Sequence, residues 1–314
     1  MKLIEFVPPR PHRLWQLCLQ MGITEVVVKV APELTGRAEP WNRDALAGVV
    51  GDLAKAGLRV VALEGDPFDM SPIKMGLPNR DEALEHYRML LGNMAELGIG
   101  LLCYNFMVGT GWHRTGEREG RGGAKATYFS LAENRRTMPG TLLSAEQVWD
   151  NYATFIQAVM PEAQRLGIRM GLHPDDPPLP SLGGMARVFG SVEAYDRAYA
   201  LAPCGANGVT FCQANFKLMG ADLDAAARHF GDRIAFVHVR DVRGTAEEFV
   251  ELFHDEGDTD QLALFRTYRE LGLDVPMRCD HVPAMAGEGD EPGFVPGYGR
   301  SEERRVGKEC RSRW

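Results

Sequence analysis

Eight short apolar runs, separated by stretches with helical periodicity, recur along residues 2–280 of this 314-residue chain. The apolar runs lie at 2–6, 25–29, 58–64, 99–104, 168–172, 208–212, 234–239 and 275–280. The helical stretches lie at 11–21, 43–56, 79–97, 144–166, 191–201, 221–230 and 259–271. Strands that alternate with helices are typical of an α/β fold with a parallel sheet. Eight units of this length predict a (β/α)₈ TIM barrel.

The predicted domain covers residues 1–300, with one long interruption. A doubly wound sheet is the alternative fold, but the first strand is not followed by the Gly-rich turn that binds dinucleotide phosphates there. The segment 105–143 is rich in Gly, Arg and Thr and has no clear period. A loop of this length is usually functional or mobile. The helix after it is expected to begin at Ser144, because Gln147 stands at the capping-box position.

Composition restricts the class of protein and its partners. Hydrophobic residues make up 45% and charged residues 25% of the chain, which is typical of a globular domain. The formal net charge of −8 argues against a nucleic-acid partner. No apolar run approaches the roughly 20 residues of a membrane span, and the N-terminus lacks a signal-peptide core. We therefore expect no membrane partner and a cytoplasmic location, in which the six cysteines are mostly reduced and buried.

Residues 301–314 differ from the rest of the chain. They contain five Lys or Arg, three Glu and few apolar residues, and they resemble a translated sequencing adapter joined to a gene cut short. A solvated basic tail is the alternative. We expect the natural sequence to stop near Arg300, and the barrel then lacks its last helix, which should follow the eighth strand.

The C-terminal ends of the strands carry the candidate metal ligands. Active sites of such barrels lie at these ends. Strands five to eight each end at a side chain that can bind a metal: His173, Cys212, His238 and Asp280. Neighbouring strands lie about 5 Å apart, so the four side chains can converge on one ion. Taken singly, His238 could be a core histidine, Cys212 a buried small residue and Asp280 the partner of an arginine. A thiolate in the set favours zinc or iron over magnesium.

Four further residues at this end of the barrel are candidates for binding a substrate. Glu64 ends strand three, and Asn105 follows strand four. Arg240 follows strand seven, and we expect it either to bind a substrate carboxylate or to form a surface salt bridge with Asp241. His113 lies in the long segment, which we expect either to close over a substrate or to stay solvated.

Five motifs carry a resemblance to a known family. They are Tyr-Asn-Phe-Met at 104–107, His-Pro-Asp-Asp-Pro-Pro at 173–178, Phe-Val-His-Val-Arg-Asp-Val-Arg-Gly at 236–244, Phe-His-Asp-Glu-Gly-Asp-Thr-Asp at 253–260 and Asp-His-Val-Pro-Ala-Met-Ala-Gly-Glu at 280–288. Together they resemble the mannonate dehydratase family over nearly all of residues 1–300. The resemblance implies a xylose-isomerase-like barrel that uses Mn²⁺ or Fe²⁺. It also implies dehydration of D-mannonate to 2-dehydro-3-deoxy-D-gluconate in hexuronate (glucuronate) breakdown.

The same resemblance implies four metal ligands: His173, Cys212, His238 and Asp280. It implies that His281 is an acid/base residue and that a tyrosine follows in a Pro-Gly-Tyr motif. This sequence has Pro-Gly-Phe at 292–294 and Pro-Gly-Tyr at 296–298, so either Phe294 or Tyr298 is the aligned position. Tyr298 has the required chemistry and is the second expected catalytic residue. The alternatives are a sugar isomerase or epimerase on the same barrel and a non-catalytic sugar-acid binding protein. The assembly could be a homo-oligomer.

Overall fold

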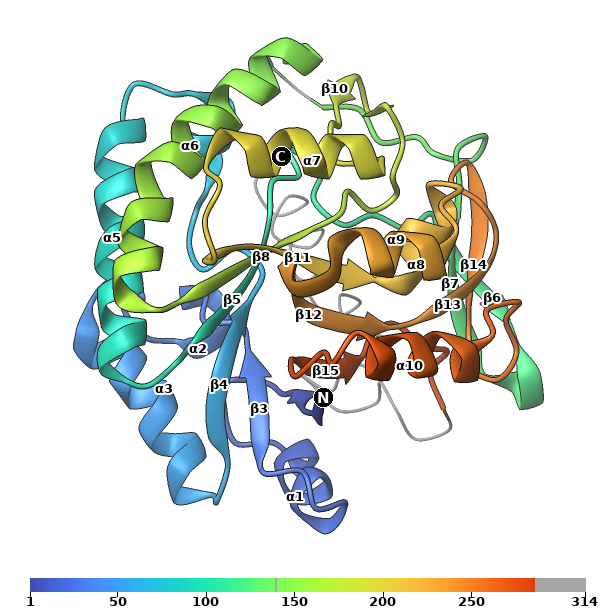
Figure 1. The fold of residues 1–314 in the computed structure, drawn as a ribbon, viewed down its shortest axis with the longest axis horizontal. Helices are drawn as coiled ribbons and strands as arrows, with labels where there is room; N and C mark the ends of the chain where they lie inside the picture. The colour runs from blue at the N-terminus through green and yellow to red at the C-terminus, as the bar shows by residue number, and fades with distance from the viewer. Residues whose placement is uncertain (139, 286–314) are drawn as a thin grey trace.

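In the computed structural model, which describes residues 1–138 and 140–285, eight parallel strands close into a barrel (Figure 1). The first barrel strand is interrupted at Ile4 and forms β1 (Lys2–Leu3) and β2 (Glu5–Phe6). β1 pairs with β15 (Pro276–Cys279), and β2 pairs with β3 (Glu25–Val28). The same short segment therefore joins the two edges of the sheet. The predicted (β/α)₈ fold is confirmed, including the eighth strand, which begins at Pro276.

The other elements of the barrel follow the predicted order, within a few residues at each end. The remaining barrel strands are β4 (Arg59–Glu64), β5 (Leu101–Asn105), β8 (Arg169–His173), β11 (Asn207–Cys212) and β12 (Ile234–Val239). The predicted helices are α1 (Arg13–Gln20), α3 (Arg43–Lys55), α5 (Arg80–Glu96), α6 (Ala145–Leu166), α7 (Val192–Leu201), α9 (Leu223–Phe230) and α10 (Gln261–Glu270). Short helical turns that we did not predict are α2 (Pro32–Thr35), α4 (Ser71–Met75), α8 (Gln213–Leu218), η1 (Arg121–Gly123) and η2 (Gly231–Arg233).

Helix α6 begins as its sequence predicts. The Ser144 hydroxyl accepts a hydrogen bond from the Gln147 backbone N–H at 3.3 Å, and the Gln147 side chain accepts one from the Ser144 N–H at 2.9 Å. This reciprocal capping box satisfies two backbone donors that the first turn leaves unpaired. Pro161 lies inside the helix without ending it, and Gly167 ends it with a φ of 70°.

Apolar side chains fill the barrel and the layer around it. Inside the barrel, a small cluster of buried residues includes Phe6, Val27, Leu101 and Phe236. A larger cluster lies between the strands and the surrounding helices, and Figure 1 shows α3, α5 and α6 along one side of the ring of strands. This packing fixes the positions of the strand ends.

A four-stranded antiparallel sheet beside the barrel was not predicted. Its strands, in spatial order, are β13 (Asp241–Thr245), β14 (Glu248–Leu252), β7 (Lys125–Ser130) and β6 (Gly116–Glu119), and Figure 1 shows them at the right of the barrel. The prediction of the segment 105–143 as an irregular loop is therefore wrong, because it supplies β6 and β7. A second small hairpin pairs β9 (Ser181–Leu182) with β10 (Met185–Ala186).

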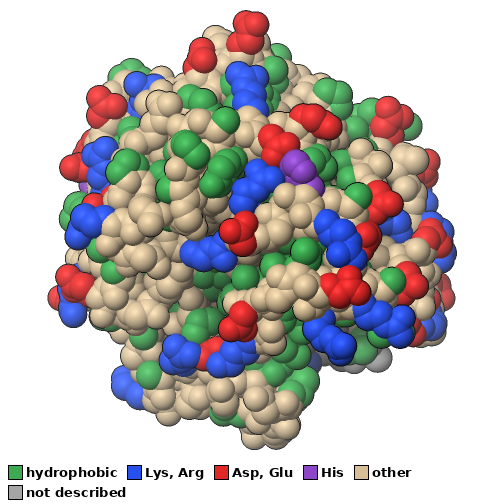
Figure 2. All heavy atoms as spheres, viewed as in Figure 1, with side chains coloured by type: hydrophobic (Ala, Val, Ile, Leu, Met, Phe, Trp, Pro, Cys, Tyr) green, Lys and Arg blue, Asp and Glu red, His purple; other side chains and the backbone are tan. Residues whose placement is uncertain are grey.

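The surface charge, the membrane-spanning potential of the helices and the C-terminal residues bear on the remaining expectations. Figure 2 shows basic and acidic side chains interspersed on the face viewed, unlike the clustered basic surface typical of nucleic-acid binding. Within residues 1–138 and 140–285, no helix is long and apolar enough to cross a membrane. The expected missing last helix and the tail at 301–314 lie outside the described residues.

Candidate metal centre and active site

The four candidate ligands lie together at the C-terminal mouth of the barrel. One donor atom from each of His173, Cys212, His238 and Asp280 lies within 4.8 Å of the others. Parallel pairing accounts for part of this arrangement, because Cys212 on β11 lies opposite His238 on β12. Asp280 follows β15, which pairs with β12 on its other side. Cys212, His238 and Asp280 are buried, and His173 is half-buried.

The surroundings of Cys212 favour its thiolate form. Burial alone raises the pKa of this thiol, but the neighbouring His173, His238 and Arg240 outweigh that effect and lower the pKa to about 6. The Arg240 Nη1 atom lies 3.7 Å from the Cys212 sulfur. Because the thiolate is the form of cysteine that binds metals, the site presents a ready soft ligand.

Asp280 and His238 face each other across the same cluster. The Asp280 Oδ2 atom lies 3.4 Å from His238 Nδ1 and 3.8 Å from the Cys212 sulfur. Burial raises the pKa of Asp280, but His281, Arg278 and His238 hold it well below its usual value. Within the described residues, neither ring nitrogen of His238 makes a hydrogen bond of ordinary geometry, although carboxylate oxygens of Asp280 and Glu64 lie 3.4 Å from Nδ1 and 3.5 Å from Nε2.

This donor set fits a divalent transition-metal ion. Two imidazoles, a thiolate and an ionised carboxylate are together the ligands that Zn²⁺, Fe²⁺ and similar ions accept. Buried imidazole nitrogens are costly to leave without hydrogen bonds, and an ion at this point would satisfy one on His238. His173, Cys212, His238 and Asp280 are therefore the residues that could hold a metal.

Of the four predicted substrate-binding residues, Glu64 and Arg240 are fully paired inside the protein. Both carboxylate oxygens of Glu64 accept hydrogen bonds from Arg278, at 2.9 and 2.6 Å. Arg240 is completely buried between Asp176 and Glu251. The alternative of a surface salt bridge between Arg240 and Asp241 is wrong, because both side chains are buried and Asp241 pairs with Lys217 instead.

Asn105 and His113 are half-buried and lie in different surroundings. Asn105, the register partner of His173, accepts a hydrogen bond from the buried Lys74 ammonium at 2.9 Å. The two ring nitrogens of His113 lie 3.1 Å from the Asn134 side-chain oxygen and 3.2 Å from the Arg136 guanidinium. Asn105 therefore borders the candidate ligands directly, and His113 is held within its own loop.

His281 lies beside the cluster and beneath the long segment. Its Nε2 atom is 3.2 Å from the Asp280 carboxylate. The Trp112 ring stacks on its imidazole, with centroids 4.9 Å apart and an interplanar angle of 9°. Burial holds the pKa of His281 well below its usual value. Tyr298 and Phe294, the two candidates for the second catalytic position, lie outside the described residues.

A buried group of four alternating charges, which we call the charge quartet, anchors the extra sheet to the barrel mouth. It consists of Arg114, Asp176, Arg240 and Glu251. Arg114 bonds Asp176 at 2.7 Å and Glu251 at 2.6 Å, and Arg240 bonds the same two carboxylates at 2.8 and 2.7 Å. The sequence motifs contain Asp176 and Arg240, but nothing local in the sequence signals Glu251 or the pairing itself.

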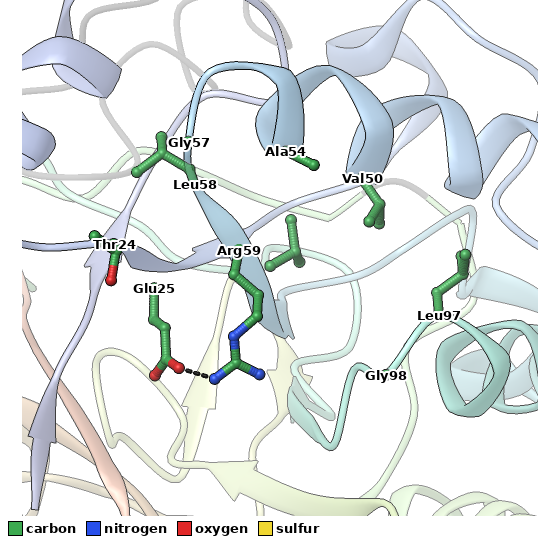
Figure 3. A pocket seen from close by; sticks show the side chains of 10 residues that line it. Thr24, Glu25, Val50, Ala54, Gly57, Leu58, Arg59, Leu97 and Gly98 are labelled. Atoms are coloured by element: carbon green, nitrogen blue, oxygen red, sulfur yellow. Dashed lines mark ion pairs between the residues drawn. The ribbon is translucent and has the colours of Figure 1, made fainter.

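A pocket of about 490 Å³ lies at the other end of the strands (Figure 3). Thr24 and Glu25 line it at the start of β3, and Leu58 and Arg59 line it at the start of β4. The Glu25 carboxylate is paired with Arg59 there, as the dashed line shows. This pocket therefore contributes nothing to the ligand cluster.

Comparisons with known proteins agree with this geometry. The family model for D-mannonate dehydratase (UxuA) matches residues 10–143 and 140–308. Mannonate dehydratase 2 of Halalkalibacterium halodurans is 30% identical over 286 residues, covering 81% of this chain and 82% of that protein. A mannonate dehydratase of Streptococcus agalactiae serotype V is 29% identical over 288 residues, covering 82% of both proteins.

Solved structures give the same result at the level of the fold. The crystal structure of mannonate dehydratase from Streptococcus suis serotype 2 matches with a TM-score of 0.83 and 26% identity, covering 98% of this chain and 92% of that chain. A xylose isomerase domain protein from Planctomyces limnophilus matches with a TM-score of 0.60 and 12% identity, over 99% and 95% of the two chains. The second likeness shows the fold alone, a xylose-isomerase-like barrel. Since the family model matches most of its length, this chain belongs to the D-mannonate dehydratase family.

Proposed function

We propose that this chain is a metal-dependent hydro-lyase that converts D-mannonate to 2-dehydro-3-deoxy-D-gluconate in the breakdown of hexuronates. The observation that carries the proposal is the convergence of two imidazoles, a thiol and a carboxylate at the mouth of the barrel. Membership of the D-mannonate dehydratase family supplies the substrate and the reaction class. The donor set supplies a means of stabilising the charge that this reaction creates.

The reaction removes the proton on C2 of the aldonate and the hydroxyl on C3. The C2 proton is poorly acidic beside a carboxylate, so the charge that develops there must be stabilised. His173, Cys212, His238 and Asp280 would hold a divalent ion, and family membership favours Mn²⁺ or Fe²⁺. When bound, such an ion supplies Lewis-acid stabilisation of the carboxylate and the 2-hydroxyl.

We assign the proton transfers to His281 and Tyr298. One takes the proton from C2, and the other protonates the leaving 3-hydroxyl. His281 is supported by its position, since it is buried beside Asp280 and its ring is fixed by the stack on Trp112. Tyr298 is assigned from the sequence motif alone, with Phe294 as the alternative position.

The polar residues around the ligands divide into two groups in this proposal. We assign half-buried Asn105, the register partner of His173, to substrate binding. His113 is assigned to substrate binding from the sequence alone, because its ring nitrogens contact Asn134 and Arg136. Glu64 forms an ion pair with Arg278, and Arg240 forms ion pairs with Asp176 and Glu251. We therefore assign those two to the support of the site.

The test is turnover of D-mannonate by the purified protein. The chain is stripped with a chelator, reloaded with Mn²⁺ and assayed for a 2-keto-3-deoxy acid that is one water lighter than the substrate. We expect product from the reloaded protein and none from the stripped protein. A product of unchanged mass would instead favour a sugar isomerase or epimerase, and binding without turnover a non-catalytic sugar-acid binding protein.

Three further expectations belong to this proposal. We propose that the enzyme acts in the cytoplasm as a single domain over residues 1–300, and that a homo-oligomer is its assembly. Size-exclusion chromatography coupled to light scattering measures the oligomeric state. A monomeric mass for the active enzyme would contradict that last point and leave the reaction unaffected.

A further inference from the structure

A closed ring of four buried side chains includes two of the candidate ligands, His238 and Asp280. It runs from His238 to Glu64, from Glu64 to Arg278, from Arg278 to Asp280 and back to His238. The four steps are 3.5 Å from His238 Nε2 to Glu64, 2.6 Å from Glu64 to Arg278, 3.0 Å from Arg278 to Asp280 and 3.4 Å from Asp280 to His238 Nδ1. Three separate barrel strands, β4, β12 and β15, contribute to this ring.

Glu64 and Arg278 each contact one of these two candidate ligands. Arg278 Nη2 donates to Asp280 Oδ1, which leaves Oδ2 directed at His238 Nδ1 and the Cys212 sulfur. Glu64 faces Nε2 on the opposite side of the His238 ring. Asp280 therefore contacts Arg278 through Oδ1 and directs Oδ2 to the cluster. His238 faces Glu64 with Nε2 and directs Nδ1 to the cluster.

Glu64 could instead be part of a second metal site, because its carboxylate, Cys103 and His238 also lie within 4.8 Å of one another. The hydrogen bonds argue against that arrangement. Both Glu64 oxygens accept from the Arg278 guanidinium, so a cation there would meet a positive charge at close range. The Cys103 sulfur already accepts a hydrogen bond from the Thr210 hydroxyl at 3.3 Å.

The tautomer of His238 connects Glu64 to metal binding. An imidazole that binds a metal through Nδ1 must carry its remaining proton on Nε2. The carboxylate that faces Nε2 here is Glu64. Carboxylates placed behind metal-bound histidines fix the tautomer and the ring orientation, and their loss typically weakens metal affinity by about 10–100-fold.

We propose that Glu64 and Arg278 are positioning residues that preset His238 and Asp280 for a divalent ion. Glu64 orients His238 through the Nε2 proton, and Arg278 holds both Glu64 and Asp280 in place. This inference rests on the metal site in the proposed function. It gives Glu64 a role other than the substrate binding expected from its position at a strand end.

The test compares Mn²⁺ affinity in two matched variants of the full chain. Glu64→Gln keeps the size of the side chain but removes its charge and one acceptor oxygen. We expect Mn²⁺ to bind about 10–100-fold more weakly, by calorimetric titration of the chelator-stripped protein. Glu25→Gln is the control, because Glu25 is also a buried strand carboxylate paired with an arginine, at the other end of the barrel. We expect the affinity of the control to equal that of the wild type.

The outcomes separate this inference from the proposed function. If the wild type binds Mn²⁺ and Glu64→Gln binds it equally well, the positioning role is wrong while the metal site stands. If the wild type binds no divalent ion, both are overturned. Circular dichroism checks that Glu64→Gln is folded. Should it fail to fold, Arg278→Lys keeps the buried positive charge without the fork that bridges Glu64 and Asp280, and the same loss of affinity is expected from it.

Discussion

Cys212 is the thiol among the candidate ligands, and neighbouring positive groups lower its pKa. Replacing it with alanine removes the thiolate, and His173→Ala removes an imidazole from the same cluster. We expect both variants to lose metal and activity together, with an affinity loss larger than the roughly 10–100-fold typical of supporting residues. Metal content after dialysis and turnover of D-mannonate measure the two effects. Cys18→Ala removes a buried cysteine on α1 that is not among the candidate ligands, and it should change neither. Full metal content in Cys212→Ala would contradict the ligand assignment.

Unlike the ligand variants, a variant of His281 should lose turnover while it keeps metal binding. His281→Asn removes the proton-transfer group but leaves all four candidate ligands in place. We expect normal Mn²⁺ binding with a kcat about 10²–10⁴-fold lower, which is the usual contribution of general acid–base catalysis. Parallel titration calorimetry and steady-state kinetics measure both quantities. A near-normal kcat would remove His281 from the proposed mechanism.

The sequence predicts each candidate ligand, but it does not predict the buried residues that contact these ligands. His173, Cys212, His238 and Asp280 each stand at the end of an apolar run, so counting along the chain brings them to one edge of the sheet. Glu64 satisfies the same rule, but its partner Arg278 is 214 residues away in the sequence. No local pattern signals that pairing, because it depends on which side chains meet inside the closed barrel.

At the scale of secondary structure, the helices and barrel strands were predictable because each has its own periodicity. The sheet formed by β6, β7, β13 and β14 was not. β6 has the sequence Gly-Glu-Arg-Glu and lacks an apolar face, so it is a strand only because β7 lies beside it. β14 pairs with β7, which comes more than a hundred residues earlier in the chain. Long-range pairing of this kind overrides the weak local preference of a strand.

The attachment of this sheet can be tested at one position on β14. Glu251→Gln leaves Arg114 and Arg240 buried against Asp176 alone, and breaking a buried ion pair in this way typically costs about 3–5 kcal/mol. We expect a loss of that order in the free energy of unfolding, measured by denaturant titration. Glu248 lies on the same strand in an exposed pair with Arg118. Glu248→Gln should cost less than about 1 kcal/mol. Equal losses in the two variants would contradict a special role for the charge quartet.

At the scale of the whole molecule, metal binding should stabilise the fold, because the candidate ligands come from four different strands. An ion that binds the folded state alone stabilises it by about 2.7 kcal/mol at a free concentration 100 times its Kd. Each kcal/mol raises Tm by roughly 2–4 °C in domains somewhat shorter than this one. We therefore expect Tm to rise by several degrees in Mn²⁺ and to return to its starting value on adding a chelator. A Tm indifferent to both would contradict a metal site that spans the strands.

The split first strand determines when this enzyme can become competent during its synthesis. Residues 2–6 are made before the rest of the barrel, but they find their second neighbour only when β15 is complete. Asp280 and His281 follow directly after β15. A ribosome-bound nascent chain can therefore form most of the helices and strands while β15, Asp280 and His281 are still missing from the barrel. We therefore expect the candidate metal site to be completed only after residues 276–280 have been made, and a ribosome stalled before residue 276 should carry a nascent chain that retains no divalent ion.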